Sequence, residues 1–286
     1  MAARPRTLPA AIAPVLVGTS LAGYAGVFHV LRFVAALLGS ILIQVGTNLS
    51  NDYSDARRGA DAEDRLGPVR VTAGGLVPPR QVLIATYVTF ALAVLAGVYL
   101  IVVAGWQLLL VGAASILAGV AYTGGPKPYG YEGLGEVFVF LFFGIVAVAG
   151  SYFVQVRHLG WEAFALAVPV GLLAAAILVV NNVRDIDSDR RAGKRTLAVR
   201  LGRERARILF AVVVYLAYGL APVTWIFGPV TAWVLLPWLT LPLAIQVVRL
   251  VRNHADGPTL NQALAQTGML QLAFCILLSA GLLLSG

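Results

Sequence analysis

Two acidic clusters in this sequence could bind a divalent cation. The first, "NLSNDYSDARRGADAEDR", runs from Asn48 to Arg65, and the second, "NNVRDIDSDRRAGKRT", runs from Asn181 to Thr196. Each follows a long apolar run and mixes Asp and Asn with basic residues. Carboxylate and amide oxygens suit Mg²⁺, which commonly shares its coordination shell with substrate phosphates. Neither cluster contains His or Cys, which argues against zinc.

The spacing within each cluster places its Asn and Asp side chains on one face of a helix, provided that the helix continues past the apolar run. Like charges one turn apart repel, and the C-terminal end of a helix disfavours carboxylates further, so a positive group is expected between the two clusters. The residues with this spacing are Asn181, Asp185 and Asp189 in the second cluster, and Asn48, Asn51 or Asp52, and Asp55 in the first.

A simpler interpretation is available for each cluster taken alone. Asn and Asp commonly end helices and build turns, and a charged loop beside a membrane can be merely solvated. Two clusters with matching helical spacing on the same membrane side favour a shared metal site. The basic residues among them would then contact phosphate oxygens, although many of them also serve as orientation signals. The basic residues that we expect to bind diphosphate are Arg65, Arg70, Arg184 and Lys194.

A third segment, "AYTGGPKPYGYEGLGE" at 121–136, is expected to form a wall or lid of the site. Its Gly and Pro residues could equally make only a tight loop. In the functional interpretation, Tyr122, Tyr129 or Tyr131 offers a π-face to a developing cation, and Lys127 meets phosphate.

The elements that must position these residues are transmembrane helices. The 286 residues are 59% hydrophobic and only 12% charged, which excludes an ordinary soluble domain. The ten-residue alternating segments of a membrane β-barrel are missing from the sequence, and its single Cys275 excludes an internal disulfide. The predicted fold is all-α, one domain over 1–286, with helices at 8–27, 31–50, 81–104, 106–123, 133–154, 161–182, 206–227, 230–251 and 264–285.

The basic residues predict the orientation of these nine helices. With an odd number of spans the termini lie on opposite sides, and 19 of the 21 Lys and Arg residues fall on the side of the N-terminus. Only Arg32 and Arg157 fall on the other side. The N-terminus and both acidic clusters are therefore expected in the cytoplasm, in a cell-membrane protein. The net charge of +8 is explained by these loops and does not indicate a nucleic-acid partner.

The motifs resemble those of the UbiA superfamily of intramembrane aromatic prenyltransferases. The segments that carry the resemblance are "NDYSDARRGAD" with "RLGPVR", "YTGGPKPYGYEGLGEVFVFLFFG" and "NNVRDIDSDRRAGKRTLAVRLG", and the likeness extends over about residues 5–285. The second segment and "RLGPVR" are similar to the naphthoate branch. The resemblance implies a nine-helix bundle around a central cavity, capped by short cytoplasmic helices. It also implies Mg²⁺-dependent transfer of a polyprenyl group from its diphosphate to 1,4-dihydroxy-2-naphthoate, with loss of CO₂, giving demethylmenaquinone.

The resemblance also assigns roles to residues. Its metal ligands would be Asn51, Asp52, Asp55, Asp61, Asp185 and Asp189, with Asp61 or Asp64 completing the first motif. Combined with the charge argument above, the expected diphosphate-binding residues are Asn48, Asn51, Arg65, Arg70, Asn181, Asn182, Arg184 and Lys194, and the expected catalytic residues are Asp55, Asp185 and Lys127.

Other functions are weighed against this one. A prenyltransferase for another aromatic acceptor, of the hydroxybenzoate type, would use the same clusters. A secondary transporter would instead bind its substrate near the bilayer midplane on broken helices, whereas these acids lie at helix ends. A membrane phosphatidyl transferase would carry a different, single Asp-rich array.

Overall fold

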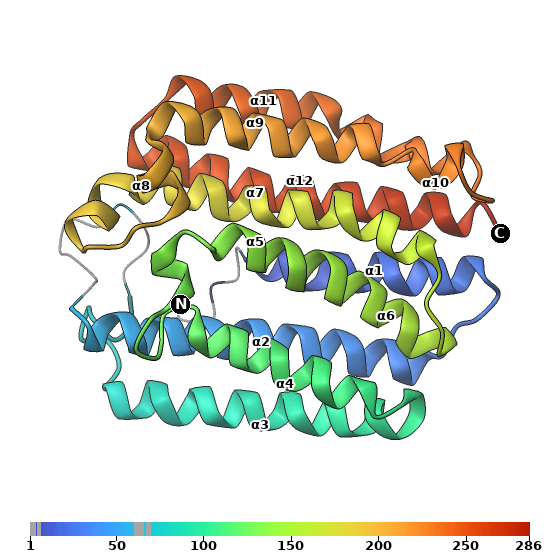
Figure 1. The fold of residues 1–286 in the computed structure, drawn as a ribbon, viewed down its shortest axis with the longest axis horizontal. Helices are drawn as coiled ribbons and strands as arrows, with labels where there is room; N and C mark the ends of the chain where they lie inside the picture. Colours follow the sequence, from blue (N-terminus) through green and yellow to red (C-terminus); the bar gives the residue numbers. More distant parts are fainter. Residues whose placement is uncertain (1–3, 5–6, 60–65, 67–69) are drawn as a thin grey trace.

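The chain forms a bundle of long helices that run side by side (Figure 1). The computed structural model describes residue 4, residues 7–59, residue 66 and residues 70–286, and no β-strand occurs among them. Seven helical segments are long and apolar enough to cross a membrane, and two shorter apolar helices, α1 and α4, lie among them. The predicted all-α membrane fold is therefore confirmed.

The elements follow the predicted apolar segments closely. In chain order they are α1 (Leu8–Tyr24), α2 (Val30–Arg57), α3 (Pro79–Ala104), α4 (Gln107–Ala121), a 3₁₀ turn (Tyr129–Glu132), α5 (Gly135–Val139), a π-helical segment (Phe140–Val146), α6 (Ala147–Val156), α7 (Trp161–Arg191), α8 (Leu197–Leu201), α9 (Arg203–Leu220), α10 (Val223–Ile226), a 3₁₀ segment (Ala232–Thr240), α11 (Leu241–Asn253) and α12 (Gly257–Leu283).

The two helices that carry the acidic clusters extend beyond their apolar runs. α2 continues from the predicted end at residue 50 to Arg57, and α7 continues from residue 182 to Arg191. Both extensions emerge at the same end of the bundle, where the α4–α5 loop and α8 also lie (Figure 1). The helical spacing of both clusters is therefore realised in the structure.

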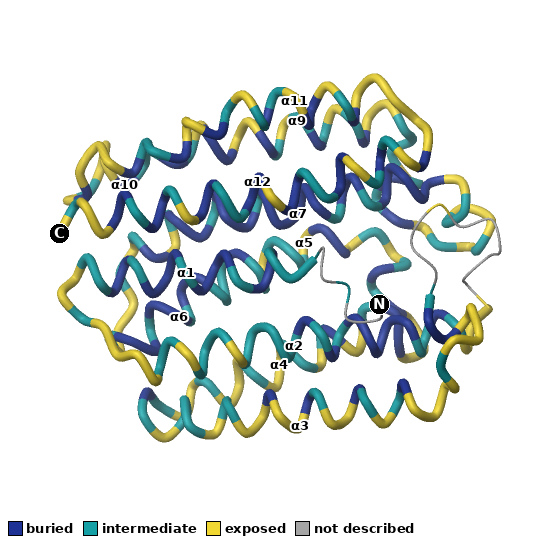
Figure 2. Tube along the Cα trace, turned by 180° about the vertical axis from the view of Figure 1, so that it is seen from behind, coloured by how far each residue is buried: buried dark blue, intermediate teal, exposed yellow. Residues whose placement is uncertain are grey.

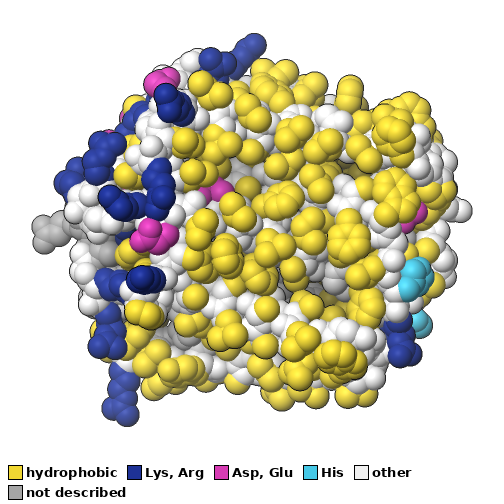
Figure 3. All heavy atoms as spheres, viewed as in Figure 1, with side chains coloured by type: hydrophobic (Ala, Val, Ile, Leu, Met, Phe, Trp, Pro, Cys, Tyr) yellow, Lys and Arg dark blue, Asp and Glu magenta, His cyan; other side chains and the backbone are white. Residues whose placement is uncertain are grey.

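α7 is the central helix of the bundle. It is buried along most of its length, whereas α3 and α4 expose large apolar side chains on the outside (Figure 2). On the face seen in Figure 3, apolar side chains form a broad band, and most of the Lys and Arg side chains gather at one end of it. Such a band is what a lipid-facing surface requires, because the hydrocarbon core offers no partner for polar groups.

The segment predicted as one regular helix at 133–154 differs from the expectation, because it contains the π-helical turns Phe140–Val146. π-Helical turns add a residue per turn and often occur at functional sites. Here they lie against α7 at a glycine pair: a Cβ on Gly144 would lie 2.6 Å from Gly171 Cα and 2.9 Å from Ala167 O. The two backbones can approach this closely only because both positions lack a side chain.

This contact predicts that Gly144→Val destabilises the protein. The added side chain must push the π-helical segment away from α7, and overpacking of this kind costs about 1–3 kcal/mol. The measurement is the midpoint of thermal unfolding in detergent, which should fall clearly. Gly150→Ala in α6 is the matched control, because a Cβ there meets nothing within 4 Å, and its midpoint should be unchanged or higher. Equal midpoints for both variants would contradict the packing argument.

Candidate functional site

The first cluster lies at the C-terminal end of α2 and turns one face toward the centre of the bundle. Asn48, Asn51 and Asp55 are buried and line the same cavity. Thr123, from the loop after α4, donates a hydrogen bond of 2.9 Å to the side-chain oxygen of Asn51. The α4–α5 loop is thereby held against this end of α2.

Asp55 is the point at which distant segments meet. Its carboxylate accepts hydrogen bonds from Arg70 Nη2 at 2.8 Å and from the Tyr131 hydroxyl at 2.6 Å. Lys194 Nζ, from the loop after α7, lies 3.6 Å from the same carboxylate and 4.8 Å from the centre of the Tyr131 ring. The two acidic clusters and the α4–α5 loop therefore converge, as their common membrane side predicted.

Asp52 lies beside Asp55 in the sequence but on a different face of α2. Its two carboxylate oxygens accept hydrogen bonds from the backbone N–H groups of Val71 and Thr72, at 3.2 and 3.0 Å. Asp52 does not line the cavity. In this position, outside the cavity, Asp52 fixes the loop segment that carries Arg70.

The second cluster lies at the C-terminal end of α7, and Arg184 organises it. The Arg184 side chain is buried and donates to both oxygens of Asp185, at 2.8 and 2.6 Å. It also donates to the side-chain oxygens of Asn181 and Asn261, at 2.9 and 2.8 Å. Arg184, which was expected to bind diphosphate, does not line the cavity and holds neighbouring side chains in place.

Asn261 and Glu136 lie behind the cavity-lining residues and hold them in place, and sequence reasoning missed both. Asn261, at the start of α12, accepts from Arg184 and donates to the backbone oxygen of Leu66, at 2.9 Å. Glu136, at the start of α5, is buried and accepts a hydrogen bond of 2.8 Å from Asn182. The sequence offered one indication of a role for Glu136, which is that an acidic residue stands directly before an apolar run. It offered no such indication for Asn261.

The tyrosines of the α4–α5 loop join the site, whereas Lys127 does not. Tyr122, Tyr129 and Tyr131 all line the cavity. Tyr122 packs edge-on against Tyr129, with ring centres 5.4 Å apart. Burial raises the pKa of Tyr129, so its phenol stays protonated. Lys127 is exposed and outside the cavity-lining set, and the lysine that lies beside Asp55 is Lys194.

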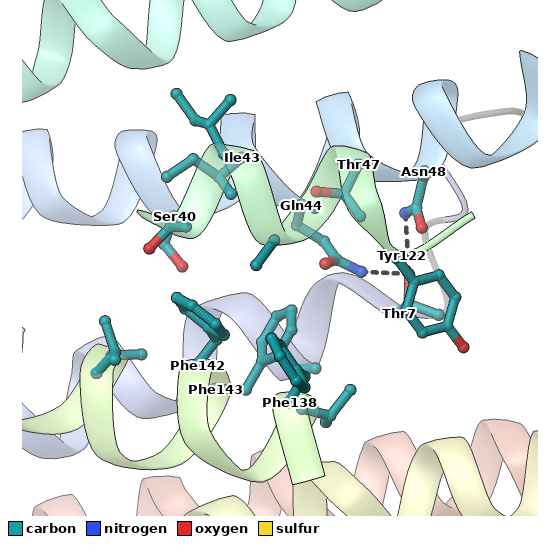
Figure 4. Close-up of a pocket in the computed structure, with 18 of the residues that line it drawn as sticks. Thr7, Ser40, Ile43, Gln44, Thr47, Asn48, Tyr122, Phe138, Phe142 and Phe143 are labelled. Atoms are coloured by element: carbon teal, nitrogen blue, oxygen red, sulfur yellow. Dashed lines mark hydrogen bonds between the residues drawn. The ribbon is translucent and has the colours of Figure 1, made fainter. Parts of the chain in front are cut away.

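The cavity that these residues share has a volume of about 490 Å³. Its charged mouth lies at the ends of α2 and α7, and an apolar arm continues between α2, α3, α4 and α6 (Figure 4 shows the middle of the cavity). The predicted residues that line the mouth are Asn48, Asn51, Asp55, Arg70, Tyr122, Tyr129, Tyr131, Asn181, Asn182, Asp185, Asp189 and Lys194. Asp61, Asp64 and Arg65 lie outside the described residues.

The donor chemistry of the mouth fits Mg²⁺. Amide and carboxylate oxygens come from two helix ends, and neither His nor Cys lines this cavity among the described residues. Within the same residues, no group of three His, Cys, Asp or Glu side chains is already gathered around one point. Asp55 and Asp185 accept from Arg70 and Arg184, but a carboxylate has about four lone-pair sites and keeps capacity for a cation.

Comparisons with known proteins identify the class to which this bundle and its cavity belong. The profile of the UbiA prenyltransferase family matches residues 11–267. The chain therefore belongs to the UbiA prenyltransferase family.

Individual relatives are similar over nearly their whole length. A 1,4-dihydroxy-2-naphthoate octaprenyltransferase of Mycobacterium tuberculosis is 41% identical over 98% of this chain and 94% of its own. The enzyme of the same name from Escherichia coli is 38% identical, over 99% of this chain and 94% of its own. A UbiA homolog from Aeropyrum pernix has the same fold, with a TM-score of 0.72 at 17% identity over 97% of both chains. A UbiA homolog from Archaeoglobus fulgidus bound to GPP and Mg²⁺ has a TM-score of 0.66 at 15% identity, over 97% of this chain and 98% of its own.

The geometry of Asp52 predicts a structural phenotype for Asp52→Ala. The change leaves two buried backbone N–H groups without acceptors, at a cost of roughly 2–4 kcal/mol, and frees the loop that carries Arg70. Thermal unfolding in detergent should show a lower midpoint, and limited proteolysis should cut faster between α2 and α3. Asp187→Ala is the control, because Asp187 is exposed and its surface pair with Arg203 contributes little. Unchanged stability with lost activity would instead return Asp52 to the cavity chemistry.

Proposed function

We propose that this protein transfers a polyprenyl group from polyprenyl diphosphate to 1,4-dihydroxy-2-naphthoate, with loss of CO₂ and diphosphate, to give the hydroquinone form of demethylmenaquinone. The observation that carries this proposal is that one cavity has a charged mouth and an apolar arm. Its mouth gathers the anionic, amide and cationic side chains that a metal-bound diphosphate requires, and its arm offers the apolar walls that a polyprenyl tail requires. The names of the near full-length relatives support the choice of acceptor.

The mouth would bind the diphosphate. Asn51, Asp55, Asp185 and Asp189 supply oxygens for Mg²⁺, which when bound would act as a Lewis acid on the diphosphate oxygens. Lys194 and Arg70 flank Asp55 and lie where the leaving diphosphate would gain negative charge. Cations that are fixed in advance around a developing charge lower the barrier without reorganisation.

The middle of the cavity would protect and direct the allylic cation that forms as the C–O bond breaks. Tyr122, Tyr129 and Phe138 form an aromatic wall directly beside the mouth, and a π-face attracts a cation. Tyr129 stays neutral and therefore cannot be alkylated as a phenolate. The apolar arm keeps water from the cation until the electron-rich ring attacks it.

The proposed topology places the mouth in the cytoplasm. α1 and α4 count as spans beside the seven longer segments, since their 17 and 15 residues are flanked by further turns and lie among the other helices (Figure 1). Nine spans put the N-terminus and the basic end on the cytoplasmic side. Arg32, an exception to the charge bias, donates to the carbonyls of Val154 and Gln155 and so caps the end of α6. The whole chain would act as one domain.

The functional test is the mass of the product. Membranes that contain this protein should convert polyprenyl diphosphate and dihydroxynaphthoate to the hydroquinone form of demethylmenaquinone and release diphosphate and CO₂, only when Mg²⁺ is present. Asp55→Asn and Asp185→Asn should each lower the rate by about 100-fold or more, because each removes a negative charge that would hold the Mg²⁺ needed for departure of the diphosphate. Asp187→Asn, on an exposed face of α7, is the control. Near wild-type rates for both cavity variants would remove the metal role.

The same assay separates the alternatives. A prenylated hydroxybenzoate, in place of the naphthoate product, would assign the protein to another acceptor. Uptake of a solute by reconstituted liposomes, with no diphosphate released, would assign it to transport.

The topology predicts which residues an impermeant thiol reagent can reach in intact cells. The native Cys275 is buried, so it is first replaced by Ser. A Cys at the exposed position Lys127 should be labelled only after the cells are opened. A Cys at the exposed position His158, at the other end of the bundle, should be labelled in intact cells. The opposite pattern would invert the proposed orientation.

A further inference from the structure

Between the charged mouth and the apolar arm lies a section of the cavity that is polar on one side and aromatic on the other. Gln44 and Thr7 point into it from α2 and from the start of α1, and Phe138 and Phe142 face them from α5 and the π-helical segment (Figure 4). Phe138 also belongs to the aromatic wall beside the mouth, whereas Gln44, Thr7 and Phe142 have no role in the proposed metal site or in the apolar arm.

The polar side is an ordered hydrogen-bond network. Gln44 Nε2 donates to the Thr7 hydroxyl at 3.1 Å, and Asn48 Nδ2 donates to the same oxygen at 3.2 Å. The Thr7 hydroxyl in turn donates to the backbone oxygen of Arg4 at 3.0 Å. Among the described residues Gln44 makes no other hydrogen bond, and it lines the cavity, so its carbonyl oxygen and second amide hydrogen are left for a ligand.

The aromatic side is a set of nearly parallel rings. Phe138 stacks on Tyr129 with centres 4.0 Å apart and planes 22° apart, and Phe142 lies 6.2 Å further on at 24°. The π-helical turns bring Phe143 to the same wall (Figure 4). An aromatic ligand would gain an offset stack of this kind in addition to its apolar burial.

We propose that this section is the seat of the aromatic acceptor, and that Gln44 selects a ring with a hydroxyl next to its carboxylate. This inference rests on the proposed function and deepens it. The Gln44 amide presents an acceptor, Oε1, beside a donor, Nε2–H. An ortho-hydroxy acid presents the complementary pair, a hydroxyl donor beside a carboxylate acceptor. A para-hydroxy acid holds these groups at opposite ends of its ring and can satisfy only one of them.

The position of Gln44 along α2 agrees with this role. Gln44 lies seven residues before Asn51, which is roughly 10 Å along the helix axis. A diphosphate held at the mouth occupies most of that length, so the first carbon of the prenyl group reaches the level of the ring. The ring carbon that bears the carboxylate is then next to the carbon that it attacks.

Gln44→Leu tests the seat. For a wild-type protein that is active, the variant should raise the KM for dihydroxynaphthoate about tenfold and leave the KM for polyprenyl diphosphate within twofold. Gln271→Leu is the matched control: it is the same substitution, at an amide buried in α12 outside the cavity-lining set. Its two KM values should remain those of the wild type.

Binding without catalysis provides the second readout. In detergent, without any prenyl diphosphate, 1-hydroxy-2-naphthoate should raise the unfolding midpoint of the wild type and of Gln271→Leu, but not that of Gln44→Leu. 4-Hydroxybenzoate should raise none of them. If Gln44→Leu fails to fold, Phe142→Leu takes its place, with the same selective rise in acceptor KM expected.

The outcomes separate the two proposals. If the wild type forms no prenylated product, the proposed function is contradicted. The binding of 1-hydroxy-2-naphthoate to the wild type and to Gln44→Leu then tests the proposed acceptor site by itself. If the wild type is active, the proposed acceptor site is tested by the KM values of Gln44→Leu. An unchanged KM for the acceptor, or a raised KM for the diphosphate instead, would contradict it. Equal stabilisation by the ortho- and para-hydroxy acids would overturn the role of Gln44 in selection.

Discussion

The buried carboxylate of Asp55 is the constraint on which the rest of the site depends. A carboxylate at the C-terminal end of a helix is disfavoured by the helix dipole, and burial adds a desolvation cost. Arg70, Lys194 and the Tyr131 hydroxyl offset both, and each comes from a different loop. One buried charge therefore ties Arg70, Tyr131 and Lys194, from three separate loops, to the end of α2 at the mouth of the cavity.

The location of Asp55 and its cationic partners follows from the two kinds of ligand in the proposed reaction. Diphosphate and a divalent cation are hydrated and approach from water, whereas a polyprenyl chain is soluble only in the bilayer. A charged group is costly in the hydrocarbon region, so a site for both must lie where helices leave the membrane. The cavity meets this condition because its charged mouth and its apolar arm lie along the same helices, α2 among them.

Much of the fold, and the convergence of the site, could be predicted because they follow from strong local patterns. Apolar length marked the spans, and the i, i+4 spacing of Asn181 and Asp185 required α7 to continue past residue 182, as it does. The partners of those residues could not be predicted. The contacts of Arg184 with Asn261 and of Asn182 with Glu136 join positions far apart in the sequence. The π-helical turns at Phe140–Val146 depend on a glycine contact with α7 that no local pattern reveals.

The positions of Asp52 and Arg184 outside the cavity share one physical cause, which is helix rotation. Successive residues on an α-helix are turned by about 100°. Asp52 is one position after Asn51, and this turn carries it from the cavity to the backbone of the following loop. Arg184 is likewise turned away from the face that carries Asn181 and Asp185, and it braces that face from the side. Within each motif, therefore, residue type alone does not separate the groups that face a ligand from the groups that hold them. The helical face on which a residue lies separates them. On α2 the cavity face carries Gln44, Asn48, Asn51 and Asp55. These residues form a continuous path from the proposed acceptor site to the proposed diphosphate site.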